Sequence, residues 1–236
     1  MTEIKTNKGI SYIVEDCRDK KTAVWKLIEN NIDLTDAILY GIDFSGLDFS
    51  GIDFSGVDFR DCVFKDTNFS GAILKNTNFE NTNLSSVNFN NANLSGSNLS
   101  GSNITNVNFK SVNLRGANLS GAIAYNANFE SANFECANLR HTDFDSANLE
   151  GANFKGANLE GANFNGANFD SASWPLSCNP LYVKIDDRVR VQLLYHAAKP
   201  KGEVIDPDLR ELLESELFKR VANKFHGIPK YCGKIN

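Results

Sequence analysis

The sequence of 236 residues lacks the motifs that mark most enzyme families. It contains no phosphate-binding P-loop, no GxGxxG, and no HExxH or GxSxG motif. The three histidines, His141, His196 and His226, are widely separated along the chain. We therefore expect no catalytic, cofactor-binding or metal-binding residues and no enzymatic activity.

Cysteine and long apolar runs are also scarce. The five cysteines are odd in number and scattered, and they form no CxxC pair, so the sequence predicts neither a disulfide framework nor a zinc site. No apolar run follows the N-terminus, and no stretch resembles a transmembrane span. We expect a cytoplasmic protein that does not associate with membranes.

Basic residues are few in the middle of the chain. Residues 33–172 carry 16 acidic and 7 basic side chains, a net charge of −9, although the whole chain carries only −5. A groove that binds nucleic acid needs clustered lysine and arginine. The charge distribution therefore predicts no direct binding of nucleic acid.

What the sequence does contain is a five-residue unit, repeated without insertion from Ile32 to Trp174. Every fifth residue from Leu34 to Trp174 is apolar, and all but Ala124 are large; we call this residue the centre of its unit. Of the 29 centres, 15 are Phe and 11 are Leu. A period of five fits neither an α-helix nor a flat strand, whereas a fixed short period indicates a stacked array.

The other positions of the unit are almost as regular. The residue two before the centre is small or branched, and the residue between them, which we call the outward slot, is nearly always Asn or Asp. Residues two apart in an extended segment share a face, so the outward slot points away from the centre. The residue two after the centre is Gly, Asn or Asp in 21 of 28 units, which predicts a corner with positive φ.

Two units illustrate a resemblance to a known family: Ala117-Asn118-Leu119-Ser120-Gly121 and Ala152-Asn153-Phe154-Lys155-Gly156. They resemble the A-[D/N]-[L/F]-x-x motif of the pentapeptide-repeat family, and the resemblance covers about three-fifths of the chain. It implies a mainly β fold, a right-handed quadrilateral parallel β-helix or solenoid with four units in each coil. On this basis residues 32–174 form the β-helix.

The two ends of the chain do not follow the repeat. Residues 1–31 are expected to form an N-terminal cap, with a short strand at 10–14 and a helix at about 18–31. Residues 175–236 are expected to form a helical module, in which a helix begins after Asp206. Its apolar stripe comprises Leu209, Leu213, Leu217, Val221 and Phe225.

The stripe has two interpretations. It either packs on the end of the β-helix or pairs with the same helix of a second chain. Some pentapeptide-repeat proteins dimerise through C-terminal helices, so the resemblance implies that a homodimer is a real alternative.

Residues 20 apart should stack on one side of the β-helix. One such column ends in Glu130, Glu150 and Asp170, three acids in succession. Like charges in neighbouring strands repel each other, so this column is a candidate recognition surface for a partner. The alternative is that these carboxylates are simply solvated and screened.

A few outward slots break the pattern. Asp43, Asp48, Asp53 and Asp58 fill four successive slots, and we expect them to form turns rather than a cation site, because four separate sides cannot converge on one ion. Four other slots are apolar: Ile38, Val63, Ile73 and Ile123. Ile123 and Tyr125 flank the one centre that is alanine, Ala124, so this unit is a candidate docking point.

Together these patterns predict a non-catalytic protein-binding or scaffold protein that presents a rigid, mostly acidic rod to a protein partner. The resemblance implies an alternative, because some family members imitate B-DNA and modulate DNA gyrase in quinolone resistance. The charge of −9 and a rod length of about 35 Å, near one turn of DNA, favour this DNA-gyrase or topoisomerase modulator. The lack of loop insertions and the alternating charges of other columns disfavour it.

Overall fold

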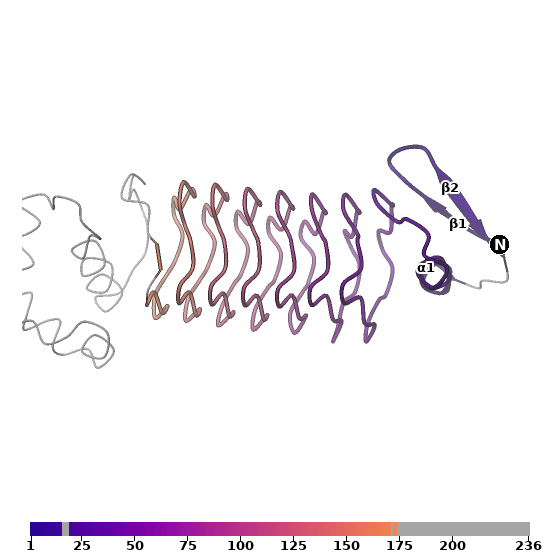
Figure 1. Cartoon of the computed structure of the whole chain (residues 1–236). Helices are drawn as coiled ribbons and strands as arrows, with labels where there is room; N and C mark the ends of the chain where they lie inside the picture. Colours follow the sequence, from indigo (N-terminus) through magenta and orange to yellow (C-terminus); the bar gives the residue numbers. More distant parts are fainter. Residues whose placement is uncertain (16–18, 171, 174–236) are drawn as a thin grey trace, which may run out of the picture.

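The computed structural model of the chain describes residues 1–15, 19–170 and 172–173. From Leu34 onward the chain winds into coils that follow one another along a single axis (Figure 1). Parallel bridges join each outward residue to the one 20 positions later, for example Asn88 to Asn108. Four units therefore make one turn of a right-handed, four-sided parallel β-helix, as the resemblance implied. Trp174 and the predicted stripe from Leu209 to Phe225 lie outside the described residues.

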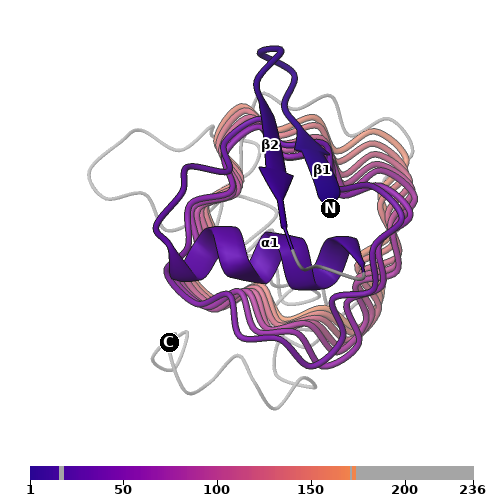
Figure 2. The ribbon, with the colours of Figure 1, turned by 90° about the vertical axis from the view of Figure 1, so that its right-hand side faces the viewer.

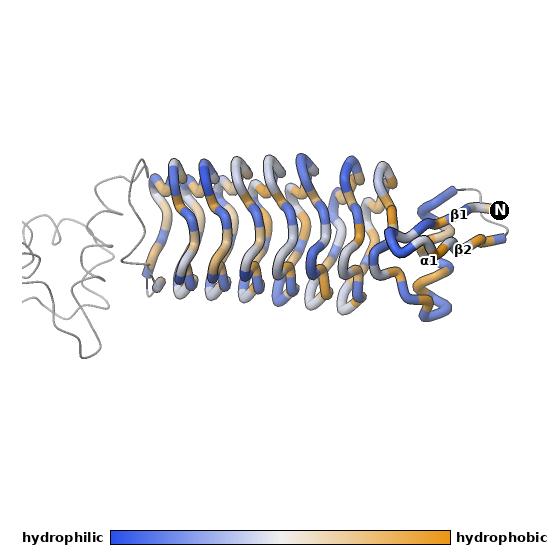
Figure 3. Tube along the Cα trace, turned by 90° about the horizontal axis from the view of Figure 1, so that it is seen from above, coloured by the Kyte–Doolittle hydropathy of each residue, from blue (hydrophilic) through white to orange (hydrophobic). Residues whose placement is uncertain are grey.

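The core is a column of the predicted centres. Every centre from Leu34 to Phe169 is at most 3% exposed. Along one side the rings of Phe69, Phe89, Phe109 and Phe129 stack with centroids 4.9 to 5.3 Å apart and planes within 6° of parallel. Burying each such ring contributes about 1.5 to 3 kcal/mol. Apolar and polar stretches consequently alternate along each coil (Figure 3).

The corners of the coils all use left-handed backbone. Between Asp36 and Gly166, 13 glycines and 14 other residues hold the slot two after the centre, and all have φ between 55° and 74°. Gly, Asn and Asp tolerate this conformation, but Cys136 and His141 adopt it as well. The stacked coils therefore impose the corner even where the residue disfavours it.

The four sides can be named by their outward columns. Face 1 has Asp43, Val63, Asn83, Asn103, Ile123, Asp143 and Asn163; face 2 has Asp48, Asn68, Asn88, Asn108, Asn128, Asn148 and Asn168; face 3 has Asp53, Ile73, Asn93, Asn113, Asn133 and Asn153; face 4 has Ile38, Asp58, Asn78, Asn98, Asn118, Asn138 and Asn158. The chain visits the faces in this order, so consecutive faces share a corner.

Outward asparagines are bonded in two directions. Within its own unit the Asn128 Oδ1 accepts the backbone N–H of Glu130, at 3.1 Å. Between coils the Asn128 Nδ2 donates to the Oδ1 of Asn108, at 3.4 Å. On face 2 these side-chain bonds run unbroken from Asn168 down to Asp48. We call this column of bonds the amide ladder.

The ladder explains why face 2 begins with an aspartate. Each amide donates toward the N-terminal end, so the first residue of a column has no acceptor below it. Aspartate only accepts, and Asp48 accepts from Asn68 Nδ2 at 2.9 Å and from Ser50 N–H at 3.0 Å. Asp43 accepts from Ser45 N–H in the same way. These contacts agree with the predicted turn-forming role.

The N-terminal segment precedes the coils. Strands β1 (Thr2–Lys5) and β2 (Ser11–Val14) form an antiparallel hairpin, of which the sequence predicted only β2. Helix α1 (Lys20–Glu29) lies across the end of the coils, beside the hairpin (Figure 2). It begins at Asp19, whose carboxylate accepts the N–H of Thr22, and its Trp25 ring lies 6.3 Å from that of Phe49. Within the described segments, no helix has the length and apolar content to cross a membrane.

Lowered pKa values of two aspartates of the first coil predict a loss of stability in acid. Hydrogen bonds from Ser45 lower the pKa of Asp43, and the backbone N–H of Ser50 lowers that of Asp48, below the ordinary value of 3.8. Because the folded pKa values are the lower ones, the stabilisation is present above the ordinary pKa and is lost as the pH falls through the folded values.

Urea unfolding of the wild type and the D43N/D48N variant tests this. The wild type should lose stability more steeply than the variant below about pH 4. A difference between the two proteins that stays constant with pH would contradict the assignment.

Candidate protein-binding face

Face 1 is the side on which the amide ladder fails. Its apolar outward residues Val63 and Ile123 cannot join the ladder. Within the described part of the chain, the single side-chain link of this column is the bond from Asn163 Nδ2 to Asp143 Oδ1, at 2.7 Å. The amide nitrogens of Asn83 and Asn103 donate to no protein acceptor in the described part of the chain. Two side-chain donors of this face therefore remain for a ligand or for water.

Backbone pairing is also interrupted on face 1. In most other units a centre N–H donates to the next coil, as Phe69 does to Asn88 O at 2.8 Å, and an outward N–H donates to the previous one, as Asn88 does to Thr67 O. Between segment 62–66 and segment 82–86, both of which the structure describes in full, neither kind of bond forms and there is no bridge. The N–H groups of Phe64 and Asn83 thus lack backbone partners.

A groove of about 460 Å³ lies at this interruption. Its walls are residues 62–66 together with Asn83, Ser85 and Ser86. Val63 is 50% exposed here, and its side chain leaves the N–H of Lys65 without the carboxamide bond that other units make. The groove therefore combines an apolar side chain with unpaired backbone groups.

The second apolar point of face 1 is the unit of Ile123 and Tyr125. Both side chains are 48% exposed, whereas the small centre between them, Ala124, is fully buried. One coil further, Asp143 accepts the N–H of Asp145 at 3.1 Å, and Asp145 accepts the hydroxyl of Ser146 at 2.7 Å. An apolar patch thus lies directly beside two carboxylates.

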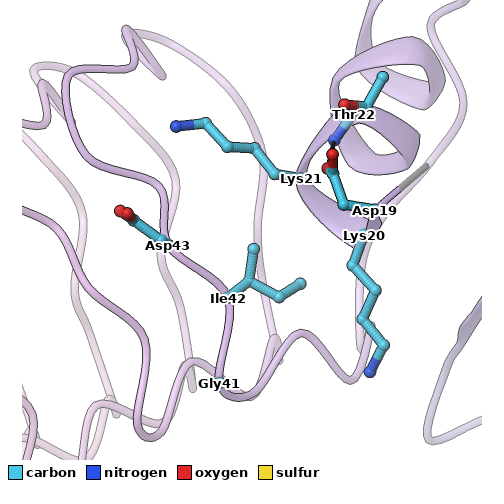
Figure 4. A pocket seen from close by; sticks show the side chains of 7 residues that line it. All are labelled: Asp19, Lys20, Lys21, Thr22, Gly41, Ile42 and Asp43. Carbon is cyan, nitrogen blue, oxygen red and sulfur yellow. Dashed lines mark hydrogen bonds between the residues drawn. The ribbon is translucent and has the colours of Figure 1, made fainter. Parts of the chain in front are cut away.

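A further hollow, of about 440 Å³, lies where the start of α1 meets the first coil of face 1 (Figure 4). Lys21 extends toward the coil, and its Nζ donates to Ser45 O at 3.3 Å, whereas Lys20 points elsewhere. Asp19 and Asp43 are engaged by Thr22 and Ser45. Three of the four charged groups of this hollow, those of Asp19, Lys21 and Asp43, are thus already bonded, so it is not a candidate site.

The predicted acidic column stands on the corner between faces 2 and 3. Glu130, Glu150 and Asp170 follow one another there at intervals of one coil. Glu130, however, pairs with Lys110 at 3.0 Å, so the column is less acidic than the sequence suggested. Ile123 and Tyr125 lie on the other side of face 2, so the structure does not bring the two parts of the predicted site together.

Other charged columns behave as expected from their alternation. Arg115 pairs with Glu135 at 3.8 Å, and Arg140 with Glu160 at 3.3 Å. Arg60 instead binds Asp58 of its own unit, at 2.7 Å. Exposed pairs of this kind contribute about 0 to 1 kcal/mol.

The described residues contain no arrangement suited to catalysis by a cysteine or a metal. Cys62 is buried, donates to Leu39 O at 3.0 Å, and has a thiol pKa raised by burial to about 11, so its reactive thiolate is disfavoured at neutral pH. Among residues 1–15, 19–170 and 172–173, no three His, Cys, Asp or Glu side chains gather closely enough to hold a metal ion.

The sequence analysis identified Val63 as one of four apolar outward residues but predicted a docking point only at Ile123 and Tyr125. The missed signal was its spacing: Val63 and Ile123 are 60 residues apart, which is three coils, so both lie on face 1. The unpaired backbone groups of Phe64 and Asn83 left no sequence signal of this kind.

Comparison with known proteins relates the chain to proteins with the same repeat. A model described as a pentapeptide repeat region matches residues 42–119, and one described as pentapeptide repeats, eight copies, matches residues 102–140 and 132–170. No curated protein matches the chain.

Solved structures give similar relatives. HetL, a pentapeptide repeat protein involved in heterocyst differentiation regulation from the cyanobacterium Nostoc sp. strain PCC 7120, is 17% identical over 70% of this chain and 93% of its own, with a TM-score of 0.36. QnrB1, a plasmid-mediated fluoroquinolone resistance protein, is 24% identical over 69% and 90%, with a TM-score of 0.40. Rfr23, from the cyanobacterium Cyanothece 51142, is 22% identical over 71% and 100%, with a TM-score of 0.26.

The broken ladder predicts that Ile123→Asn stabilises the fold. The new amide is placed to accept the N–H of Tyr125 and to donate to Asn103, as its counterparts do on face 2. We expect the free energy of unfolding to rise by about 0.5 to 1.5 kcal/mol, measured by urea unfolding.

Asn133→Ile is the matched control, because Asn133 holds the equivalent slot of face 3 and bonds Asn113, Asn153 and Glu135 N–H. This substitution should lower stability. If Ile123→Asn were the more destabilising of the two, the ladder account of face 1 would be wrong.

Proposed function

Because the chain belongs to the pentapeptide-repeat family, we propose that it is a non-catalytic protein-binding protein and that face 1 receives its partner. The observation that carries the proposal is the combination on one face of a failed ladder, a groove and exposed apolar side chains at Val63, Ile123 and Tyr125. Of the four large apolar side chains that are exposed between Leu34 and Asp170, these three lie on face 1 or its edge; the fourth is Tyr40.

Side chains on the other faces are engaged more fully with one another. The ladder of face 2 runs from Asp48 to Asn168, and that of face 3 from Asn93 to Asn153. A protein that bound there would have to compete with existing hydrogen bonds. On face 1 it would cover apolar surface and meet polar groups that have no protein partner, which favours association.

Affinity capture from the source organism tests the proposal. Wild-type protein, an I123N/Y125S variant and an N133I variant serve as baits, and captured proteins are quantified by mass spectrometry. A genuine partner should be captured by the wild type and by N133I and be reduced about tenfold or more on I123N/Y125S. Identical captures on all three baits would contradict the use of face 1.

The alternative function, a modulator of DNA gyrase or topoisomerase, is favoured by one observation. Residues 33–172 carry a net charge of −9. Faces 1 and 2, together with the corner that follows each of them, hold eight acidic and two basic side chains. QnrB1, with similar repeats, is a fluoroquinolone resistance protein. Against this function, ion pairs such as Lys110–Glu130 and Arg140–Glu160 neutralise part of the acidic surface.

A supercoiling assay with purified gyrase separates the two functions. We expect micromolar protein neither to inhibit supercoiling nor to protect the enzyme from a quinolone, because the charge columns do not follow the regular spacing of phosphates. Inhibition or protection in this concentration range would favour the alternative.

A further inference from the structure

The partner-binding strip of face 1 has an order that indicates what it binds. We define the strip as Val63, Asn83, Asn103, Ile123 and Asp143, with Tyr125 and Asp145 at its edge. Along it lie the groove beside Val63, two free amide donors, an apolar patch and two carboxylates. Resting on the proposed function, we propose that the strip binds an extended segment of the partner protein that carries two apolar residues and a lysine or arginine.

The unpaired backbone at the groove argues for an extended segment. Phe64 N–H and Asp66 N–H are donors without partners in the described chain, and the carbonyls of Cys62 and Ser85 are acceptors without them. An extended peptide that crosses the coils here carries unbonded N–H and C=O groups of its own, and those above the groove can bond single backbone groups of this kind. A folded, convex partner surface presents most of its backbone groups already bonded, so it could meet these groups only with side chains.

The spacing of the apolar points sets the spacing in the partner. Val63 and Ile123 are three coils apart, which is about 14 Å at the roughly 4.8 Å separation of neighbouring strands. Residues four apart in an extended segment share a face and are separated by about 13 Å. Between the two points the amides of Asn83 and Asn103 are placed to donate to peptide carbonyls.

The carboxylates of the strip indicate the third feature of the partner segment, its lysine or arginine. Asp143 lies one coil beyond Ile123, about 19 Å from Val63, a distance that an extended segment covers in about six residues. In the described ranges 1–15, 19–170 and 172–173, Asp143 and Asp145 have no ion-pair partner, and Arg140 at the far edge of the face is neutralised by Glu160. A guanidinium or ammonium at this point would meet both carboxylates, and an arginine would also reach the ring of Tyr125.

Selection from a phage-displayed random-peptide library on the full chain tests the proposal. The peptides that are enriched should carry two apolar residues about four positions apart. A lysine or arginine should lie about two positions beyond one of them, outside the pair. A synthetic peptide of this pattern should bind at least tenfold more weakly to I123N and to D143N/D145N, and with unchanged affinity to N133I. Thermal unfolding confirms that each variant is folded.

Several results would overturn the proposal. Three concern the peptides: no enrichment at all, enrichment of peptides without a basic residue, or equal binding of the synthetic peptide to the wild type and to I123N. The fourth is self-association of the wild type in sedimentation, abolished by Ile123→Asn, because it would assign the strip to a second copy of the chain. A lysate protein that needs face 1 but binds through a folded surface would refute the extended segment and leave the proposed function standing. If no captured protein depends on face 1, both fail.

Discussion

The hydrogen bond that an outward asparagine makes to its neighbour one coil earlier governs how the exterior of this β-helix is organised. A carboxamide can accept from its own unit and donate to the previous coil at the same time, as Asn128 does. The bond therefore has a direction, and aspartate suits the positions where no acceptor lies below. Asp48 begins the ladder of face 2, and Asp143 follows Ile123, whose side chain accepts nothing.

Much of the fold could be predicted from the sequence because the repeat specifies local environments. The buried centres, the outward asparagines and the corners follow from a period of five and from the preferences of Phe, Asn and Gly. Even the ion pair Arg140–Glu160 could be anticipated from stacking at intervals of 20 residues. Cys136 and His141 at positive φ show that the array also shapes residues that would not choose this conformation.

Other features depend on contacts that no short pattern encodes. Strand β1 forms because it pairs with β2, and its sequence carries no strong strand signal of its own. Arg60 binds Asp58 within its unit instead of Glu80 one coil away, and Glu130 is neutralised by Lys110. The interruption beside Phe64 involves backbone groups, which are identical in every unit, so the sequence could mark it only indirectly through Val63.

Binding on this exterior depends on where the regular bonding stops. Faces that complete their ladder offer a partner few unsatisfied groups, whereas face 1 exposes apolar side chains, two amide donors and unpaired backbone within a short distance. A rigid rod of this kind acts through the position of its irregularities, since the rest of the array is stable and uniform. The interruption between Val63 and Asn83 is therefore central to the account.

Backbone hydrogen exchange, read residue by residue by NMR, tests that interruption most directly. Phe64 and Asn83 should exchange much faster than Phe69 and Asn88, which occupy the same positions on face 2 and are bonded between coils. Equal protection at the two pairs would mean that face 1 is closed like its neighbour, and would contradict the account.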